Sequence, residues 1–210
     1  MAGHLLIVVP IIHTYTDMGS IRGRVPFSKK CGEVAVSYWE KVFNYLKNWS
    51  GDFSKLKVYQ DGLLDTEPEV VKRIVAETQS ENYEVLRWLK NQGASILGTE
   101  GPALLEEYRC LQAIAKAPDE ISKQAALAEY RRKSPWLLED RDKYIANRIN
   151  STLGEEETGL LFLGVKHDVA SYLDQEIRIN QPETLINSLK EALLEIESET
   201  RRVFIGKERI

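Results

Sequence analysis

Four short apolar segments, separated by longer stretches with a different periodicity, define the pattern of this chain. Residues 5–12 form a continuous, largely β-branched run, and the segments 56–62, 94–101 and 158–164 have a similar character. Continuous apolar runs are typical of strands that are buried on both faces of a parallel sheet. The sequence therefore predicts an α/β fold with a mainly parallel central sheet flanked by helices, in a single domain over residues 1–210.

Helical spacing of apolar residues fills the stretches between these runs. Residues 66–93 are the clearest case, because Thr66 is placed to cap the helix and Glu69 completes a capping box. A later helix is expected to begin with Ser134 as its cap and Pro135 in its first turn. The other helices are expected over 32–49, over 103–132 with a break near Pro118, and over 182–202, where the sequence predicts an amphipathic C-terminal helix.

The composition excludes several classes of protein. The chain is 43% hydrophobic and 29% charged with a net charge of −4, which is ordinary for a globular protein. A basic stripe with interleaved aromatic residues is missing, so nucleic acid is not an expected partner. Cys31 and Cys110 show no metal-binding or disulfide spacing. The run 5–12 is too short to span a bilayer and lacks signal-peptide features, so we expect a cytoplasmic protein without membrane contact.

Chemically reactive side chains follow the predicted strands. His13 follows the first strand, Glu100 the third and His167 the fourth. Ligands of open α/β sheets bind outside the carboxyl ends of the strands, so we expect these three side chains to converge. Two imidazoles and a carboxylate suit a divalent transition metal such as Mn, Co or Zn, and they equally suit a metal-free acid/base site. The structural alternative is that each histidine is a solvated or capping residue.

Four further polar residues are candidates for contact with a substrate. Asp61 follows the weaker second strand within an Asp-Gly pair, which is more typical of a turn. The loop after His13 carries Asp17, Arg22 and Arg24, which we expect at the rim of the site. The cations of this loop favour an anionic or carboxylate-bearing ligand, and the alternative is a solvated basic loop.

One charged residue interrupts an apolar stripe. Arg141 lies four residues from both Leu137 and Ile145, so it shares the apolar face of its helix. A buried guanidinium needs a carboxylate, backbone carbonyls or a bound anion. The alternatives are a structural ion pair with Glu100, an orienting role in the site, and a contact with a substrate oxyanion. One of the two flanking aspartates is expected to hold a histidine by its second ring nitrogen, and Asp142 is also a candidate substrate contact.

Four motifs resemble those of a known superfamily. "EDRDKYIANRI" resembles the "ERNxxMAxxI" helix of the TraB/PrgY/Tiki proteins, and "ETGLLFLGVKHDV" resembles their late "GxxH" strand, with Gly164 and His167 matching. "GASILGTEG" resembles the strand that carries a glutamate, here Glu100, and "LLIVVPIIHTYTDMG" resembles the opening "GxxH" strand. Two places depart from the pattern. Pro10 replaces the first glycine, and "DRD" replaces "ERN" around the retained Arg141.

The resemblance implies an EreA/ChaN-like fold and the position of the site, whereas the chemistry differs among the members. Tiki members look like metal-dependent proteases built on two histidines and a glutamate, EreA members look like metal-independent esterases, and ChaN-like members bind haem iron. The leading hypothesis is a hydrolase that acts on an ester or amide bond of a small molecule or peptide. Its catalytic residues would be His13, Glu100, His167 and Arg141, with the first three as ligands if a metal is bound.

Two other classes of function are compatible with the sequence. One is a metal- or small-molecule-binding protein without turnover, such as a sensor, and the other is a structural protein whose histidines are incidental. The last helix has an apolar stripe that can pack on its own domain or on a second copy, so a homodimer is also predicted.

Overall fold

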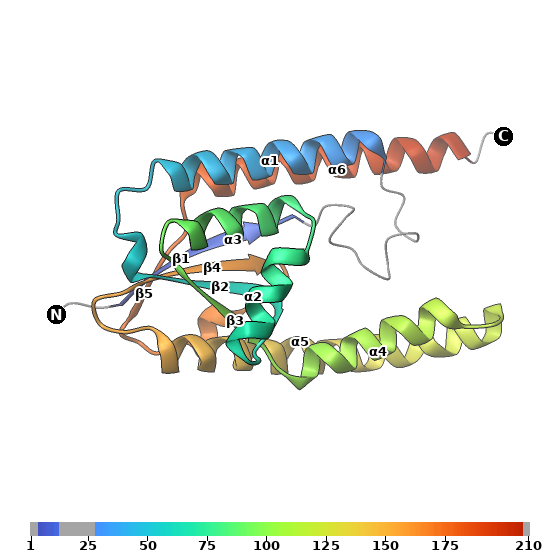
Figure 1. Ribbon diagram of the computed structural model, residues 1–210. Helices are drawn as coiled ribbons and strands as arrows, with labels where there is room; N and C mark the ends of the chain where they lie inside the picture. Colours follow the sequence, from blue (N-terminus) through green and yellow to red (C-terminus); the bar gives the residue numbers. More distant parts are fainter. Residues whose placement is uncertain (1–3, 13–27, 208–210) are drawn as a thin grey trace.

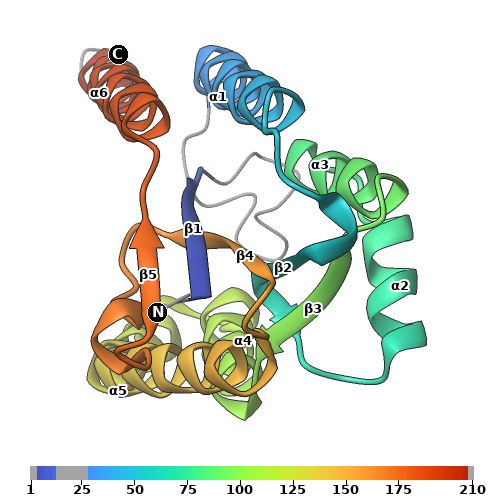
Figure 2. The same ribbon diagram turned by 90° about the vertical axis from the view of Figure 1, so that its left-hand side faces the viewer.

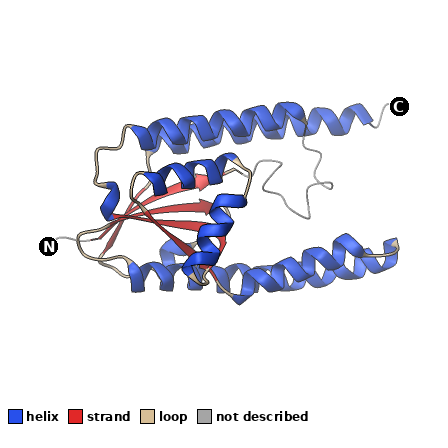
Figure 3. Cartoon of the chain, in the orientation of Figure 1, coloured by secondary structure: helices blue, strands red, loops and turns tan. Residues whose placement is uncertain are grey.

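The computed structural model describes residues 4–12 and 28–207 (Figure 1). These residues form strands, α-helices and two short 3-10 helices, which Figure 3 distinguishes by colour. In chain order the elements are β1 (His4–Ile11), α1 (Lys29–Lys47), η2 (Phe53–Lys55), β2 (Leu56–Leu64), α2 (Pro68–Glu77), α3 (Glu81–Asn91), β3 (Ser95–Glu100), α4 (Pro102–Lys116), α5 (Glu120–Thr152), β4 (Thr158–Gly164), η3 (Val169–Tyr172), β5 (Ile177–Asn180) and α6 (Glu183–Lys207).

The strands form one parallel sheet in the order β3-β2-β4-β1-β5. Ile11 at the end of β1 lies opposite Gly164 at the end of β4, and Leu64 at the end of β2 lies opposite Glu100 at the end of β3. A parallel sheet brings the carboxyl ends of its strands to one edge. The predicted α/β fold, with a parallel central sheet between helices, is confirmed.

The sheet has a fifth strand that the apolar pattern did not predict. β5 has the sequence "IRIN", is largely exposed, and pairs with β1 from His4 to Ile7. A short strand at the edge of a sheet has no need of the continuous apolar run that marks a strand buried on both faces. The pattern that found the other four strands therefore missed this one.

The single helix predicted over 66–93 is wrong, because the segment forms two helices. α2 ends at Glu77 and α3 begins after Ser80, whose side chain accepts a hydrogen bond from the Tyr83 amide. The expected capping box is absent, since Glu67 is the N-cap residue of α2 and makes no side-chain capping bond. The Ser80 cap satisfies a backbone amide at the start of α3, so the apolar pattern continues across two helices and not one.

The helix start expected at Ser134 is also wrong, whereas the break near Pro118 is confirmed. α5 continues without interruption from Glu120 through Pro135 to Thr152. A proline inside a helix removes one backbone hydrogen bond and costs about 3 kcal/mol. α5 packs along α4, whose side chains Leu104, Cys110 and Ile114 are buried, and this packing offsets the cost.

Helices cover both faces of the sheet (Figure 2). α1, α3 and α6 lie over one face, and their buried side chains form a large apolar cluster with the strands. α5 lies over the other face and packs Ile145, Ala146 and Ile149 against Leu6 and Tyr59. The hairpin of α4 and the first half of α5 extends beyond the sheet (Figure 1). The carboxyl edge of the sheet is therefore close to the root of this hairpin.

The amphipathic C-terminal helix is present as α6, which lies along α1 (Figure 1). Leu185, Leu189 and Ala192 are buried in the core of their own chain. Packing on the same domain thus accounts for part of the apolar stripe of α6, and the homodimer stays a prediction. None of the helices described for residues 28–207 combines the length and apolarity needed to cross a membrane.

Candidate functional site

A buried guanidinium lies at the carboxyl edge of the sheet. Arg141 of α5, whose side chain is 10% exposed, donates from Nε to Glu100 Oε2 at 3.0 Å and from Nη2 to Glu100 Oε1 at 2.6 Å. Nη2 also donates to Asp61 Oδ1 at 2.7 Å, and Nη1 donates to Glu107 Oε2 at 2.6 Å. The predicted burial of Arg141 and its contact with Glu100 are confirmed. Because each of its three nitrogens binds a carboxylate, the ion pair with Glu100 is the alternative that the contacts support, and the orienting role stays a prediction.

The strand ends present two carboxyl groups to this guanidinium. Asp61 follows Tyr59 by two residues on β2, so both side chains lie on the face that α5 covers. Glu100 is the last residue of β3 and is fully buried. Two backbone amides hold the carboxylates, with Gly62 N–H 3.2 Å from Glu100 Oε1 and Gly164 N–H 2.9 Å from Asp61 Oδ2. Asp61 therefore belongs to a buried cluster with Glu100 and Arg141. It lies within β2, so the expectation of a simple turn residue is corrected.

Gly164 stands where the cluster leaves no room for a side chain. A Cβ atom at this position would lie 2.9 Å from Asp61 Oδ2 and 3.4 Å from the ring of His167. The absence of a side chain lets the backbone of β4 pass close enough to Asp61 to donate its N–H. This gives a steric reason for the glycine in the sequence "GVKH".

His167 lies between two carboxylates. Its Nδ1 is 2.5 Å from Asp142 Oδ1, and its Nε2 is 3.4 Å from Asp61 Oδ2. The other oxygen of Asp142 accepts from the Asp168 amide at 3.0 Å, and the His167 side chain is only 5% exposed. The prediction that an aspartate flanking Arg141 holds a histidine is confirmed, with Asp142 as that residue. A carboxylate at one ring nitrogen fixes the orientation of the imidazole.

The two carboxyl groups on Arg141 differ in acidity. Burial raises the pKa of Glu100 to about 7, an effect that the Arg141 guanidinium opposes and the charge of Asp61 reinforces. Burial also disfavours the ionised form of Asp61, but the charges of His167 and Arg141 outweigh it and lower the pKa of Asp61. Neighbouring acids whose pKa values are pushed apart are typical of sites that move protons.

Glu107 and Tyr130 contact this cluster from α4 and α5, and the sequence analysis missed both. The Tyr130 hydroxyl donates to Glu107 Oε1 at 2.9 Å, while Glu107 Oε2 accepts from Arg141. The signal that could have found Glu107 is the one that found Arg141, a charge on an apolar stripe. Glu107 lies three residues from both Leu104 and Cys110, which are buried on α4.

Four of the predicted site residues lie outside the described residues, namely His13, Asp17, Arg22 and Arg24. Ile12 is the last described residue before them, and its carbonyl accepts a hydrogen bond of 3.0 Å from Trp39 Nε1. The chain thus reaches the carboxyl edge of the sheet beside β4. The contributions of these four residues stay predictions.

A metal centre does not follow from the described residues. Within 4–12 and 28–207, no three histidine, cysteine, aspartate or glutamate side chains are placed to hold a metal ion. Both oxygens of Glu100 accept from Arg141, and Asp61 and Asp142 occupy the two sides of His167. The divalent transition metal therefore stays a prediction that depends on His13.

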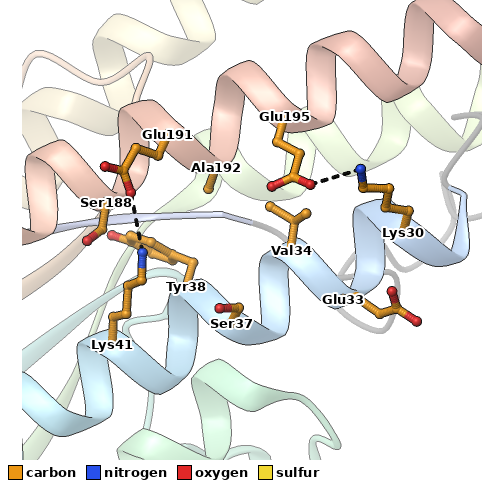
Figure 4. Close-up of a pocket in the computed structure, with 10 residues that line it drawn as sticks. All are labelled: Lys30, Glu33, Val34, Ser37, Tyr38, Lys41, Ser188, Glu191, Ala192 and Glu195. Carbon is orange, nitrogen blue, oxygen red and sulfur yellow. Dashed lines mark hydrogen bonds and ion pairs between the residues drawn. The ribbon is translucent and has the colours of Figure 1, made fainter.

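A surface groove lies on the opposite face of the sheet, between α1 and α6 (Figure 4). Its volume is about 270 Å³, and two ion pairs cross it, Lys30 with Glu195 at 3.0 Å and Lys41 with Glu191 at 3.4 Å. Tyr38, which also lines it, donates its hydroxyl to a carbonyl of β1 at 2.5 Å. These contacts join the two helices to each other and to the sheet, so packing accounts for the groove.

Comparisons with known proteins do not test the resemblance to the TraB/PrgY/Tiki superfamily. No protein-family model matches the chain, no curated protein matches it, and no solved structure matches its fold. The similarity to the TraB/PrgY/Tiki superfamily, and with it the EreA/ChaN-like assignment, stays a prediction.

Proposed function

We propose that the chain is a hydrolase that activates water at the buried cluster of Glu100, Asp61, Arg141 and His167 and cleaves an ester or amide bond. One observation carries this proposal. Two adjacent carboxyl groups with separated pKa values share one guanidinium beside an imidazole that an aspartate holds in place. A group whose pKa lies near neutral pH exchanges protons readily under ordinary conditions.

In this proposal Glu100 is the general base. It takes a proton from water, and the water oxygen bonds to the carbonyl carbon of the substrate. His167 in its imidazolium form donates a proton from Nε2 to the leaving oxygen or nitrogen as the bond to carbon breaks. The net result is one water consumed for one carboxylic acid and one alcohol or amine released.

Asp61 supports the return of the proton. It shares Nη2 of Arg141 with Glu100 and lies 3.4 Å from Nε2 of His167, so it lies between the base and the acid. Arg141 holds both carboxyl groups, and Asp142 holds the imidazole. His13 would complete the site as a second imidazole, and a divalent metal would supply Lewis-acid polarisation of water if one binds there.

A second candidate is a metal- or small-molecule-binding protein without turnover. The burial of the cluster favours it, because Glu100 is fully buried and the oxygens and nitrogens described above already have partners within the chain. In that case the cluster would hold the fold in one arrangement, and a ligand would bind beside it.

A screen of ester, amide and phosphoester substrates tests the proposal, with Mn, Co, Zn or no metal added. Glu100→Gln and His13→Ala are each expected to lower the rate by about a hundredfold to ten-thousandfold, the usual effect of losing a positioned acid/base group. Glu156→Gln, at an exposed glutamate paired with Lys55, removes the same charge elsewhere and should change nothing. An activity that survives both site substitutions does not come from this cluster. A binding protein without turnover then becomes the better explanation of the structure.

A further inference from the structure

Glu107 carries the contact between the helical hairpin and the buried cluster. Its Oε2 accepts from Arg141 Nη1 at 2.6 Å, and its Oε1 accepts from the Tyr130 hydroxyl at 2.9 Å. Burial together with this hydrogen bond raises the pKa of Tyr130 to about 12, so its hydroxyl stays protonated near neutral pH. Each oxygen of Glu107 thus has a donor, and the side chain is 19% exposed.

The carboxylates approach Arg141 from two layers of the fold. Asp61 and Glu100 come from the sheet, whereas Glu107 comes from α4, seven residues after Glu100. Figure 1 shows α4 leaving the edge of the sheet and returning as α5, the helix that carries Arg141. Since a guanidinium is a rigid planar fork, a partner at Nη1 also fixes the direction of Nε and Nη2.

Gly101 allows this arrangement at the root of the hairpin. A Cβ atom on Gly101 would lie 2.5 Å from the ring of Tyr144 on α5, so α4 starts in close contact with α5. That approach brings Glu107, about one and a half turns into α4, within reach of Arg141. The Glu107 contact is therefore built into the packing of the two helices.

We propose that Glu107 is a positioning residue that, together with Tyr130, holds the Arg141 guanidinium in the orientation in which it serves Glu100 and Asp61. The inference rests on the proposed function, in which that carboxyl pair moves the proton. Glu107 acts through Arg141 and touches no substrate in this role. The α4–α5 hairpin thereby sets the geometry of the site at the sheet edge.

Glu106, the preceding residue, supplies a matched control. Its carboxylate pairs with Lys133 at 2.9 Å and with Arg109 at 3.3 Å, and these partners are partly or largely exposed. Glu106→Gln therefore removes the same charge from the same helix turn without touching Arg141. Exposed ion pairs of this kind contribute little to stability.

The test measures how firmly the Arg141 side chain is held. The readout is the rate of hydrogen exchange at its Nε–H in NMR spectra of the full chain. Arg141→Lys assigns the signal by removing it. Glu107→Gln is expected to speed the exchange about tenfold, because a charge-assisted hydrogen bond that fixes the guanidinium is weakened. Tyr130→Phe should speed it by a smaller factor, and Glu106→Gln should leave it unchanged.

The outcomes separate this inference from the hydrolase proposal, because the signal needs no substrate. Equal exchange in Glu107→Gln and the unsubstituted chain, or equal acceleration in Glu107→Gln and Glu106→Gln, overturns the positioning role. Should Glu107→Gln fail to fold, Tyr130→Phe decides the question, since it keeps every charge in place. Where an activity is found, Glu107→Gln should lower kcat and leave KM unchanged. A chain without activity but with the expected exchange pattern contradicts the proposed function alone.

Discussion

The two faces of the sheet are covered by helices that bury different kinds of side chain. None of the six residues that α1 buries is charged, whereas two of the five residues that α5 buries are Arg141 and Asp142. The other three buried residues of α5 are apolar and lie over the middle of the sheet. The charged pair lies where the strands end. Position along the strands, as well as the face, thus decides where charge is buried.

Under the proposed function, this difference separates the part of the fold that serves stability from the part that serves chemistry. Apolar packing stabilises a protein roughly in proportion to the area it removes from water. A buried ion pair stabilises much less, because desolvation offsets most of the attraction between its charges. The α1 face is therefore explained by folding alone. By this reasoning, apolar residues of similar volume in place of the cluster around Arg141 would cost the fold little, which supports the functional role proposed above.

Removal of the central cation should have the largest effect on stability. Arg141→Met leaves the carboxyl groups of Asp61, Glu100 and Glu107 buried without their cation, and should lower the free energy of unfolding by about 3–5 kcal/mol at pH 8. Arg141→Lys keeps the charge but not the planar fork, so its loss should be smaller. The loss in Arg141→Met should also shrink at pH 5, where Glu100 binds a proton. Urea unfolding at both pH values measures this, and a loss below about 1 kcal/mol at pH 8 would contradict the account.

A cavity in the apolar face should have a somewhat smaller effect that does not change with pH. Leu86 of α3 is fully buried in the apolar cluster, so Leu86→Ala should lower the free energy of unfolding by about 2–4 kcal/mol. Its loss should be the same at pH 5 and pH 8, because no titrating group is involved. If the loss varied with pH as strongly as in Arg141→Met, the two faces would not differ in the way proposed.

Much of the site could be predicted because its residues break local patterns. Glu100 and His167 stand at strand ends, and Arg141 interrupts an apolar stripe, so each is visible within a few residues of sequence. Glu107 interrupts a stripe too, but its partner lies on another helix, 34 residues away in the chain. Its role depends on how α4 and α5 pack.

The errors in the predicted fold have a similar origin. β5 is ordered by pairing with β1, and "IRIN" is only four residues long, with apolar-polar alternation in place of the continuous apolar run that marked the other strands. The continuation of α5 through Pro135 depends on packing against α4, which outweighs the local preference for a helix start. Both depend on contacts between segments that are far apart in the sequence. Local propensities and periodicity do not contain that information.

The difference in unfolding free energy between the unsubstituted chain and Glu100→Gln, followed against pH, tests the central claim that Glu100 is a buried proton-binding group. Burial raises the pKa of Glu100 from 4.5 to about 7 in the folded state. Proton binding by Glu100 therefore stabilises the folded chain fully below pH 4.5, and this stabilisation is lost as the pH rises through 7. The unsubstituted chain should therefore lose stability relative to Glu100→Gln between pH 4.5 and 7.5, by on the order of 2–3 kcal/mol. Exposed Glu156→Gln should show no such change in this range. A difference that stays constant with pH would mean that Glu100 binds its proton equally in the folded and the unfolded chain, and would contradict the raised pKa on which the proposed chemistry depends.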